Sequence, residues 1–342
     1  MPGTRESLTI PAMKLRILSR EDVKSAISMS QAIETVKSAF AQLSRGHARV
    51  PVRTQLGVSR HDGVTLFMPA YLEDTDELGM KMVSVFSGNV ERSLPIINAI
   101  VTLVDPETGL PIALLDGTYL TALRTGAASG AATDLLARPD ARTVAILGSG
   151  VQGRTQLHAV STVRNIERVL VFDARRGAAE RFRDEMSRAG APLPGRIDVA
   201  STAKEAISEA DVVCTATTSS TPVFSDSDLR EGTHINAIGS FTPEMQELPA
   251  ETVARALLVV DSREAAWAEA GDLIIAKKRG LITESSVHAE LGEIVAGTKS
   301  GRTGASQVTL FKSVGNAVQD VSVGARILRE AEKNGLGRVV DL

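Results

Sequence analysis

A glycine-rich turn is the clearest chemical signal in the sequence. Gly148, Gly150 and Gly153 form a G-x-G-x-x-G pattern, which follows the apolar run 143–147 and opens a segment with helical spacing. In this context the first glycine allows a tight turn, the second admits a pyrophosphate and the third lets the helix approach the strand. Amide groups at the start of a helix also favour a bound phosphate. The pattern therefore predicts a dinucleotide-binding site.

An acidic residue supports this prediction and indicates which dinucleotide is bound. Asp173 follows the apolar run 169–172, about 20 residues after the last glycine of the pattern. A carboxylate there accepts a hydrogen bond from the 2′-hydroxyl of an adenosine ribose and repels a 2′-phosphate. The sequence thus favours NAD(H). NADP(H) stays possible, because Arg175 and Arg176 follow closely and could bind a phosphate.

Two further segments are expected to face the nicotinamide part of the cofactor. Thr215 and Thr217 lie at the end of one predicted strand, and Ile238 and Gly239 lie at the end of another. Ligands of open parallel sheets bind beyond the carboxyl ends of the strands. Both segments are therefore candidates for cofactor contacts.

The first third of the chain has the pattern of a mixed domain. Apolar residues at helical spacing follow Ser30, and Gly46 ends this helix. Short β-type runs come next, with tight turns between them, which favours a largely antiparallel sheet. These runs are 50–58, 64–69, 78–86, 96–104 and 111–115.

The rest of the chain has the pattern of a parallel sheet. A helix of small residues is predicted from Thr118 to Ala137, after which apolar strands alternate with helices. This alternation favours a doubly wound parallel sheet of the Rossmann type. A last helix is predicted from Lys312 to Ala331. The fold class is therefore α/β. Its expected domains are an N-terminal α/β domain of residues 1–125, onto which segment 312–342 packs back, and a Rossmann domain of residues 126–311.

Composition excludes several classes of protein. The 342 residues carry a net charge of −3, which does not suit a nucleic-acid-binding surface. The single cysteine, Cys214, excludes an internal disulfide framework, and the five histidines are not at metal-ligand spacing, so no metal site is predicted. No run approaches a membrane span, and no targeting segment precedes Leu18, so we expect a cytoplasmic protein. Segment 1–12 is expected to be a loose extension.

Several blocks of the sequence, taken in order, resemble the ornithine cyclodeaminase and mu-crystallin family. The most specific are Leu123-Arg124-Thr125 and Gly148-Ser149-Gly150-Val151-Gln152. The resemblance covers nearly the whole chain beyond about residue 15. The other matching blocks are 51–54, 79–83, 235–239, 259–262, 271–272, 290–293 and 311–315.

The resemblance implies both an architecture and an activity. Family members bind substrate and form a homodimer with the N-terminal domain, and they act on small 2-amino and 2-imino acids with NAD(P)(H). The cofactor would be held by Thr125, Gly148, Ser149, Gly150, Val151, Gln152, Gly153, Asp173, Arg175, Thr215, Thr217, Ile238, Gly239 and Ser313.

The resemblance also places Arg53, Lys81 and Arg124 in the substrate pocket. Their chemistry suits a 2-imino acid, because arginine pairs a carboxylate through two hydrogen bonds and lysine adds a point charge. Lys81 and Arg124 lie among apolar neighbours, where a cation without an anionic partner is costly. We expect all three to bind the substrate, and Lys81 and Arg124 to take part in catalysis. Surface charges are the alternative interpretation.

One position departs from the family pattern. Ornithine cyclodeaminases carry an aspartate in a Gly-Asp-Cys-Pro-like run, and Phe241 stands at the matching position here. A phenyl ring cannot accept a proton, although Glu244 or Glu247 could replace the carboxylate. The change favours an NAD(P)H-dependent reductase of cyclic ketimines such as Δ1-pyrroline-2-carboxylate or Δ1-piperideine-2-carboxylate, with an L-amino acid as product.

Other functions stay open at this point. The nearest are reduction of a linear imine such as iminosuccinate to aspartate, ornithine cyclodeamination and alanine dehydrogenation. A function of another class is nucleotide or ligand binding with little turnover, as in mu-crystallin. The three cations favour catalysis over binding alone.

Overall fold

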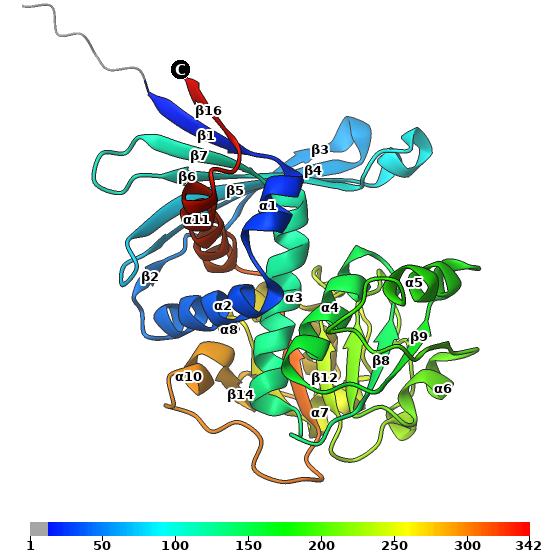
Figure 1. The fold of residues 1–342 in the computed structure, drawn as a ribbon. Coiled ribbons are helices and arrows are strands. Elements are labelled where there is room, and N and C mark those ends of the chain that lie inside the picture. Colours follow the sequence, from blue (N-terminus) through cyan, green and yellow to red (C-terminus); the bar gives the residue numbers. More distant parts are fainter. Residues whose placement is uncertain (1–12) are drawn as a thin grey trace, which may run out of the picture.

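The computed structural model describes residues 13–342 and consists of two eight-stranded sheets. The extension expected at residues 1–12 lies outside this range. Helix α3 (Gly117–Leu136) runs from the first sheet to the second (Figure 1). In the part of the chain that is described, no helix is long and apolar enough to cross a bilayer.

The first sheet is largely antiparallel, as predicted. Its strand order is β16-β1-β7-β6-β5-β4-β2, with β3 paired to β4, and only β1 and β7 pair in parallel. The strands are β1 (Lys14–Leu18), β2 (Ala48–Arg49), β3 (Thr54–Val58), β4 (Gly63–Leu72), β5 (Glu77–Phe86), β6 (Ile97–Val104), β7 (Pro111–Asp116) and β16 (Arg338–Asp341).

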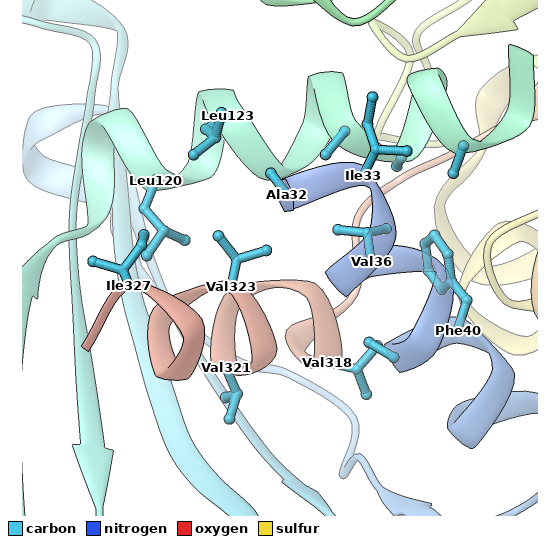
Figure 2. Close-up of a cluster of buried hydrophobic side chains, with 14 of the residues drawn as sticks. Ala32, Ile33, Val36, Phe40, Leu120, Leu123, Val318, Val321, Val323 and Ile327 are labelled. Carbon is cyan, nitrogen blue, oxygen red and sulfur yellow. The ribbon is translucent and has the colours of Figure 1, made fainter. Parts of the chain in front are cut away.

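Helices cover one face of this sheet. They are α1 (Arg20–Ala26), α2 (Met29–Ser44), α3 and α11 (Ala317–Asn334). Leu120 of α3 and Val323 and Ile327 of α11 belong to the same buried cluster as Ile33 and Val36 of α2 (Figure 2). These aliphatic contacts hold the final helix against the first sheet, to which the next strand, β16, also belongs.

The second sheet is entirely parallel and confirms the predicted Rossmann-type fold. Its order is β10-β9-β8-β11-β12-β15-β13-β14. The strands are β8 (Thr143–Leu147), β9 (Arg168–Phe172), β10 (Ile197–Val199), β11 (Val212–Thr215), β12 (His234–Ala237), β13 (Leu257–Val260), β14 (Val287–Glu290) and β15 (Thr309–Lys312). The helices are α4 (Val151–Val163), α5 (Ala178–Met186), α6 (Ala203–Ile207), α7 (Ala250–Arg255), α8 (Arg263–Glu269), α9 (Gly271–Lys278) and α10 (Leu291–Val295).

Both faces of this sheet are covered. Alternate residues of β8 belong to different buried clusters: Ile146 packs with Leu157 of α4, and Leu147 belongs to the cluster that contains Ile207 of α6. Cys214 lies in the first of these clusters and is fully buried, and burial raises the pKa of its thiol to about 12. Cys214 is therefore a packing residue of the sheet.

Three predicted boundaries are wrong. Helix α2 is capped by Ser28, whose hydroxyl and Gln31 form a capping box, and not by Ser30. Helix α3 is capped by Asp116, whose carboxylate accepts from the Tyr119 amide at 2.8 Å, so Thr118 lies within the first turn.

The third boundary is the start of the final helix. Residues Thr309–Lys312 form β15, because this apolar run is buried between β12 and β13. Helix α11 therefore begins at Ala317, where the Asn316 side chain accepts from the Val318 amide.

Candidate active site

The glycine-rich turn forms an open cradle at the carboxyl end of β8. Gly148 adopts φ +98°, and a Cβ there would lie 2.5 Å from the Ala216 carbonyl oxygen. A Cβ on Gly153 would collide with the Gly148 carbonyl oxygen. At Gly150, which caps α4, no other heavy atom lies within 4 Å of a built Cβ. The free space lies where the sequence places the pyrophosphate.

A pocket of about 470 Å³ lies beside this cradle. Five of the expected cofactor residues line it: Gly148, Gly150, Asp173, Arg175 and Thr217. Thr218, Ser219 and Val223 also line the pocket but were not predicted as cofactor contacts. Thr218 and Ser219 directly follow Thr217, in the strand-end segment that the sequence indicates. Nothing in the sequence indicates Val223. Outside its lining lie Thr125, Ser149, Val151, Gln152, Gly153, Thr215, Ile238, Gly239 and Ser313.

Asp173 is held by five hydrogen-bond donors. Its Oδ2 accepts from the Ser149 amide at 2.8 Å, the Ser149 hydroxyl at 2.7 Å and the Arg175 guanidinium at 3.1 Å. Its Oδ1 accepts from the Arg175 amide and Nε at 2.9 and 3.1 Å. Partial burial raises the pKa of Asp173, but the bonds from Arg175 and Ser149 outweigh it and hold the pKa below its usual range. The Arg175 side chain is 72% exposed although it pairs with this carboxylate.

Glu247 joins the two strand ends that face this region. Its Oε1 accepts from the Thr217 amide at 2.6 Å and hydroxyl at 2.8 Å, and its Oε2 accepts from the Thr215 hydroxyl at 2.9 Å and the Gly239 amide at 2.7 Å. The side chain is fully buried, and burial raises the pKa of its carboxyl group. Glu247 therefore does not supply a free carboxylate to a substrate. Glu244 lies exposed in the same loop.

We expect Glu247→Gln to weaken the hydrogen bonds that hold the segments at the ends of β11 and β12 together. An amide NH2 would face the Gly239 and Ser240 amides, which are donors as well, and buried donors would lose their acceptor. The free energy of unfolding should fall by about 1–3 kcal/mol, and the KM for NADH should rise about tenfold. Urea unfolding and steady-state kinetics measure the two effects. Glu244→Gln is the matched control, and equal behaviour of the two variants would contradict this role.

Three charged side chains from separate elements form a buried cluster. Lys81 of β5 lies 2.7 Å from Asp320 of α11, and Nε of Arg124 of α3 lies 3.0 Å from the other carboxylate oxygen. Arg124 also donates to the Gln319 side chain at 2.8 Å. Lys81 is 1% and Arg124 6% exposed. The structure thus brings together the two cations expected to act in catalysis, and it adds an acidic partner that the sequence did not reveal.

Lys81 is easier to deprotonate than an ordinary lysine. Burial and the positive charge of Arg124 lower its pKa to about 8, although Asp320 raises it. The charge of Arg53 lowers it further, so the three predicted substrate-binding cations act on one another electrostatically. A lysine with this pKa can give up or regain a proton near neutral pH.

The segment after β15 supports Arg124. Gly315 adopts φ +86°, and a Cβ there would lie 2.6 Å from the Arg124 guanidinium. Asp261, at the end of β13, fixes this segment by accepting from the Ser313 hydroxyl at 2.7 Å and the Gly315 amide at 2.8 Å. The Ser313 hydroxyl, expected to contact cofactor, binds Asp261 in this structure.

Arg53 lines a pocket beside this cluster, together with Met68, Gly315 and Glu269. Met68 of β4 is the cross-strand partner of Lys81 in β5, so the pocket adjoins the buried lysine. Arg53 forms an ion pair with Glu269 of α8. Burial raises the pKa of Glu269, and the charge of Arg53 opposes this shift. No spacing in the sequence identifies Glu269, because its partner comes from a distant segment.

Comparisons with known proteins identify the family of this chain. The model of the ornithine cyclodeaminase/mu-crystallin family matches residues 13–335. The chain belongs to this family. The sequence-based recognition of the family is therefore confirmed, and so is the fold class.

Individual members of the family are similar to this chain over nearly their full length. A Δ1-pyrroline-2-carboxylate reductase of Bacillus cereus is 41% identical over 95% of this chain and 99% of its own. The Thermococcus litoralis Δ1-pyrroline-2-carboxylate reductase, solved in complex with NADH and L-proline, has a TM-score of 0.91 and is 46% identical, covering 94% of this chain and 99% of its own. An archaeal alanine dehydrogenase dimer with bound NAD has a TM-score of 0.89 and is 38% identical, covering 96% and 100%.

Proposed function

We propose that this chain is an NAD(P)H-dependent reductase of small cyclic 2-imino acids, with Δ1-pyrroline-2-carboxylate as the leading substrate and Δ1-piperideine-2-carboxylate as the ring homologue. The buried Lys81–Asp320–Arg124 cluster beside the Arg53 pocket carries this proposal. Two cations share a single carboxylate there, which leaves positive charge for an anionic substrate. The names of the relatives from Bacillus cereus and Thermococcus litoralis support the same reaction.

The residues of the second sheet fit a nicotinamide dinucleotide. The open space at Gly150 and the start of α4 suit the pyrophosphate, and Asp173 suits the ribose. When bound, the cofactor supplies a hydride to the carbon of the C=N bond.

Binding of the substrate and donation of a proton fall to the cationic side chains of the protein. In this proposal Arg124 and Arg53 bind the substrate carboxylate, and Arg53 then gives up its ion pair with Glu269. Lys81, protonated below its pKa of about 8, holds a proton at Nζ that can be donated to the substrate. Lys81 is only 1% exposed, so bulk water does not reach its ammonium group.

A turnover panel tests the proposal. Oxidation of NADH and of NADPH is followed with each of the two cyclic ketimines, with pyruvate plus ammonia and with oxaloacetate plus ammonia, and ornithine with NAD is run beside them. We expect turnover with a cyclic ketimine and none with ornithine. Proline formed from ornithine, or turnover with only the linear imines, would contradict the proposal. Cofactor binding without any turnover would favour a binding protein.

We expect Arg175→Ala to shift the cofactor preference further toward NADH. The substitution removes the side chain that bonds the Asp173 carboxylate, which frees acceptor capacity for a ribose hydroxyl, and it removes the cation nearest to a 2′-phosphate. The ratio of kcat/KM for NADH to that for NADPH should rise about tenfold. Arg183→Ala, an exposed arginine on α5, is the control. An unchanged ratio would show that Arg175 does not discriminate between NADH and NADPH.

We also propose a homodimer formed through the first sheet. The face of this sheet away from the helices carries Ile17 and Ile100, which are 39% and 38% exposed, and Met80 and Met82 lie half-buried on the same face of β5. The archaeal relative is a dimer. Light scattering should give the mass of two chains, and a monomeric mass would contradict the proposal. The cytoplasmic location stays a prediction.

A further inference from the structure

A second group of buried charges lies at the carboxyl ends of the parallel strands, separate from the cluster around Lys81. Lys312, the last residue of β15, lies 3.0 Å from Asp272 of α9, and both side chains are fully buried. The other oxygen of Asp272 accepts from the Glu247 amide at 2.7 Å and the Leu248 amide at 2.9 Å. Glu247 is fully buried as well. We name Lys312, Asp272 and Glu247 the Lys312 cluster.

The Lys312 cluster carries an excess of negative charge. Each oxygen of Glu247 accepts from a backbone amide, that of Thr217 for Oε1 and that of Gly239 for Oε2, and such bonds favour the ionised carboxylate. Burial raises the pKa of Glu247, the charge of Lys312 lowers it and the charge of Asp272 raises it, so the three groups interact electrostatically. Two carboxylates share a single ammonium group, which leaves a net charge of −1.

This charge lies next to the cofactor pocket. The strands of the second sheet follow the order β9-β8-β11-β12-β15. Asp173 follows β9 and the open space at Gly150 follows β8, so we expect a dinucleotide bound at both to extend its nicotinamide half toward β11, β12 and β15. Thr217, whose amide and hydroxyl donate to Glu247, lines the cofactor pocket of about 470 Å³. The Lys312 cluster therefore lies directly behind the wall of that pocket.

The two redox states of the cofactor differ in their response to such a charge. NAD⁺ and NADH share the adenosine, the pyrophosphate and both riboses, and they differ by one positive charge on the nicotinamide ring. A buried negative charge attracts a cationic ring more strongly than the same charge does in water. We propose that the Lys312 cluster is an electrostatic determinant of cofactor affinity, which stabilises the oxidised nicotinamide relative to the reduced one. The inference rests on the proposed cofactor and not on the identity of the imine.

The two buried clusters of the candidate active site thus have opposite charges. Lys81 and Arg124 share only Asp320, which leaves positive charge for the substrate carboxylate. The Lys312 cluster leaves negative charge for the oxidised ring, and this charge favours the proposed reduction, because donation of a hydride leaves the ring cationic. One segment connects the clusters: Lys312 ends β15, and Gly315, three residues later, lies against the Arg124 guanidinium.

Dissociation constants test the inference without turnover. The Kd for NAD⁺ and the Kd for NADH are measured by titration calorimetry on the wild-type chain and on Glu247→Gln and Lys312→Met. The ratio of the Kd for NADH to the Kd for NAD⁺ isolates the effect of the ring charge, because all other cofactor contacts are shared. Glu247→Gln removes a negative charge and should lower this ratio at least about threefold, whereas Lys312→Met removes the positive charge and should raise it by a similar factor.

The double variant Asp272→Asn/Lys312→Met is the matched control. It removes one charge of each sign and leaves the net charge of the cluster unchanged, and the remaining amide oxygen can still accept from the Glu247 and Leu248 amides. Its ratio should equal that of the wild-type chain even if both affinities fall, because a disturbed fold weakens the binding of both redox states alike. Where Glu247→Gln does not fold, the difference between Lys312→Met and the double variant still tests the inference.

The direction of the two shifts decides the outcome. A ratio that stays constant in both single variants, or moves in the same direction in both, would overturn the electrostatic role and leave the Lys312 cluster a purely structural feature. Shifts in opposite directions would support it. Shifted ratios in a protein that reduces no cyclic ketimine would contradict the proposed function and leave this inference standing.

Discussion

Lys81→Met should reduce kcat/KM for the cyclic ketimine by about 10²–10⁴, which is the range that a positioned proton donor contributes. Methionine has nearly the same length and suits the buried environment of β5, so the fold should persist. Asp320 keeps its hydrogen bond from Arg124, at 3.0 Å, and is not left without a partner. The loss should therefore reflect the missing ammonium group rather than a collapsed site.

The size and the type of the loss distinguish a proton donor from a residue that only binds substrate. Proton donation predicts a fall in kcat, whereas loss of carboxylate binding alone predicts a higher KM with little change in kcat. NADH affinity, measured by fluorescence, and the melting temperature should match those of Lys24→Met, a variant of an exposed lysine on α1. Turnover of Lys81→Met near the wild-type rate would remove Lys81 from the mechanism.

The parts of the site that the sequence predicts well depend on residues close together in the chain. The cradle at Gly148 to Gly153 is a local turn between a strand and a helix, and each glycine has a steric reason that spacing alone reveals. Asp173 follows from the strand that must pair beside β8. Short-range geometry of this kind does not depend on the rest of the fold.

The parts that the sequence does not predict depend on contacts between distant segments. Asp320 reaches Lys81 and Arg124 only because α11 returns to the first sheet, and Glu269 reaches Arg53 only because α8 lies beside that segment. Glu247 had been an alternative to the missing aspartate, but its position at the junction of β11 and β12 uses both oxygens. A carboxylate in the sequence does not reveal whether its partners will be substrate or backbone amides.

The same limit explains why β15 was not recognised and why the last helix was predicted to begin at Lys312, the final residue of this strand. Its apolar residues fit a buried strand and a buried helix equally well, and four residues are too few to show a period. Only its neighbours β12 and β13 fix it as a strand. This placement matters for the site, because Gly315, which follows β15, lies against the Arg124 guanidinium.

Asp320→Asn should have the largest effect on stability of the changes considered. The substitution leaves Lys81 and Arg124 buried without the carboxylate that pairs with both, and breaking a buried pair of this kind costs about 3–5 kcal/mol. Burial already lowers the pKa of Lys81 to about 8, and loss of Asp320, which raises it, lowers it further. The difference in stability from Lys81 is therefore complete at low pH and fades as the pH approaches 8, above which Lys81 is neutral in both folded proteins. The loss of stability should therefore be greatest at low pH and decrease as the pH rises.

The same substitution should move the pH dependence of activity. The wild-type protein is expected to lose kcat/KM above a pKa of about 8 as Lys81 loses its proton, and Asp320 is the group that holds this pKa up. In Asp320→Asn the alkaline limb should shift to lower pH, so that activity lost at pH 8 is partly recovered in more acidic buffer. Asp184→Asn, an exposed carboxylate on α5, is the matched control. Urea unfolding and kcat/KM across a pH series measure both effects, and an unshifted limb together with unchanged stability would show that Asp320 neither supports the fold nor sets the charge of Lys81.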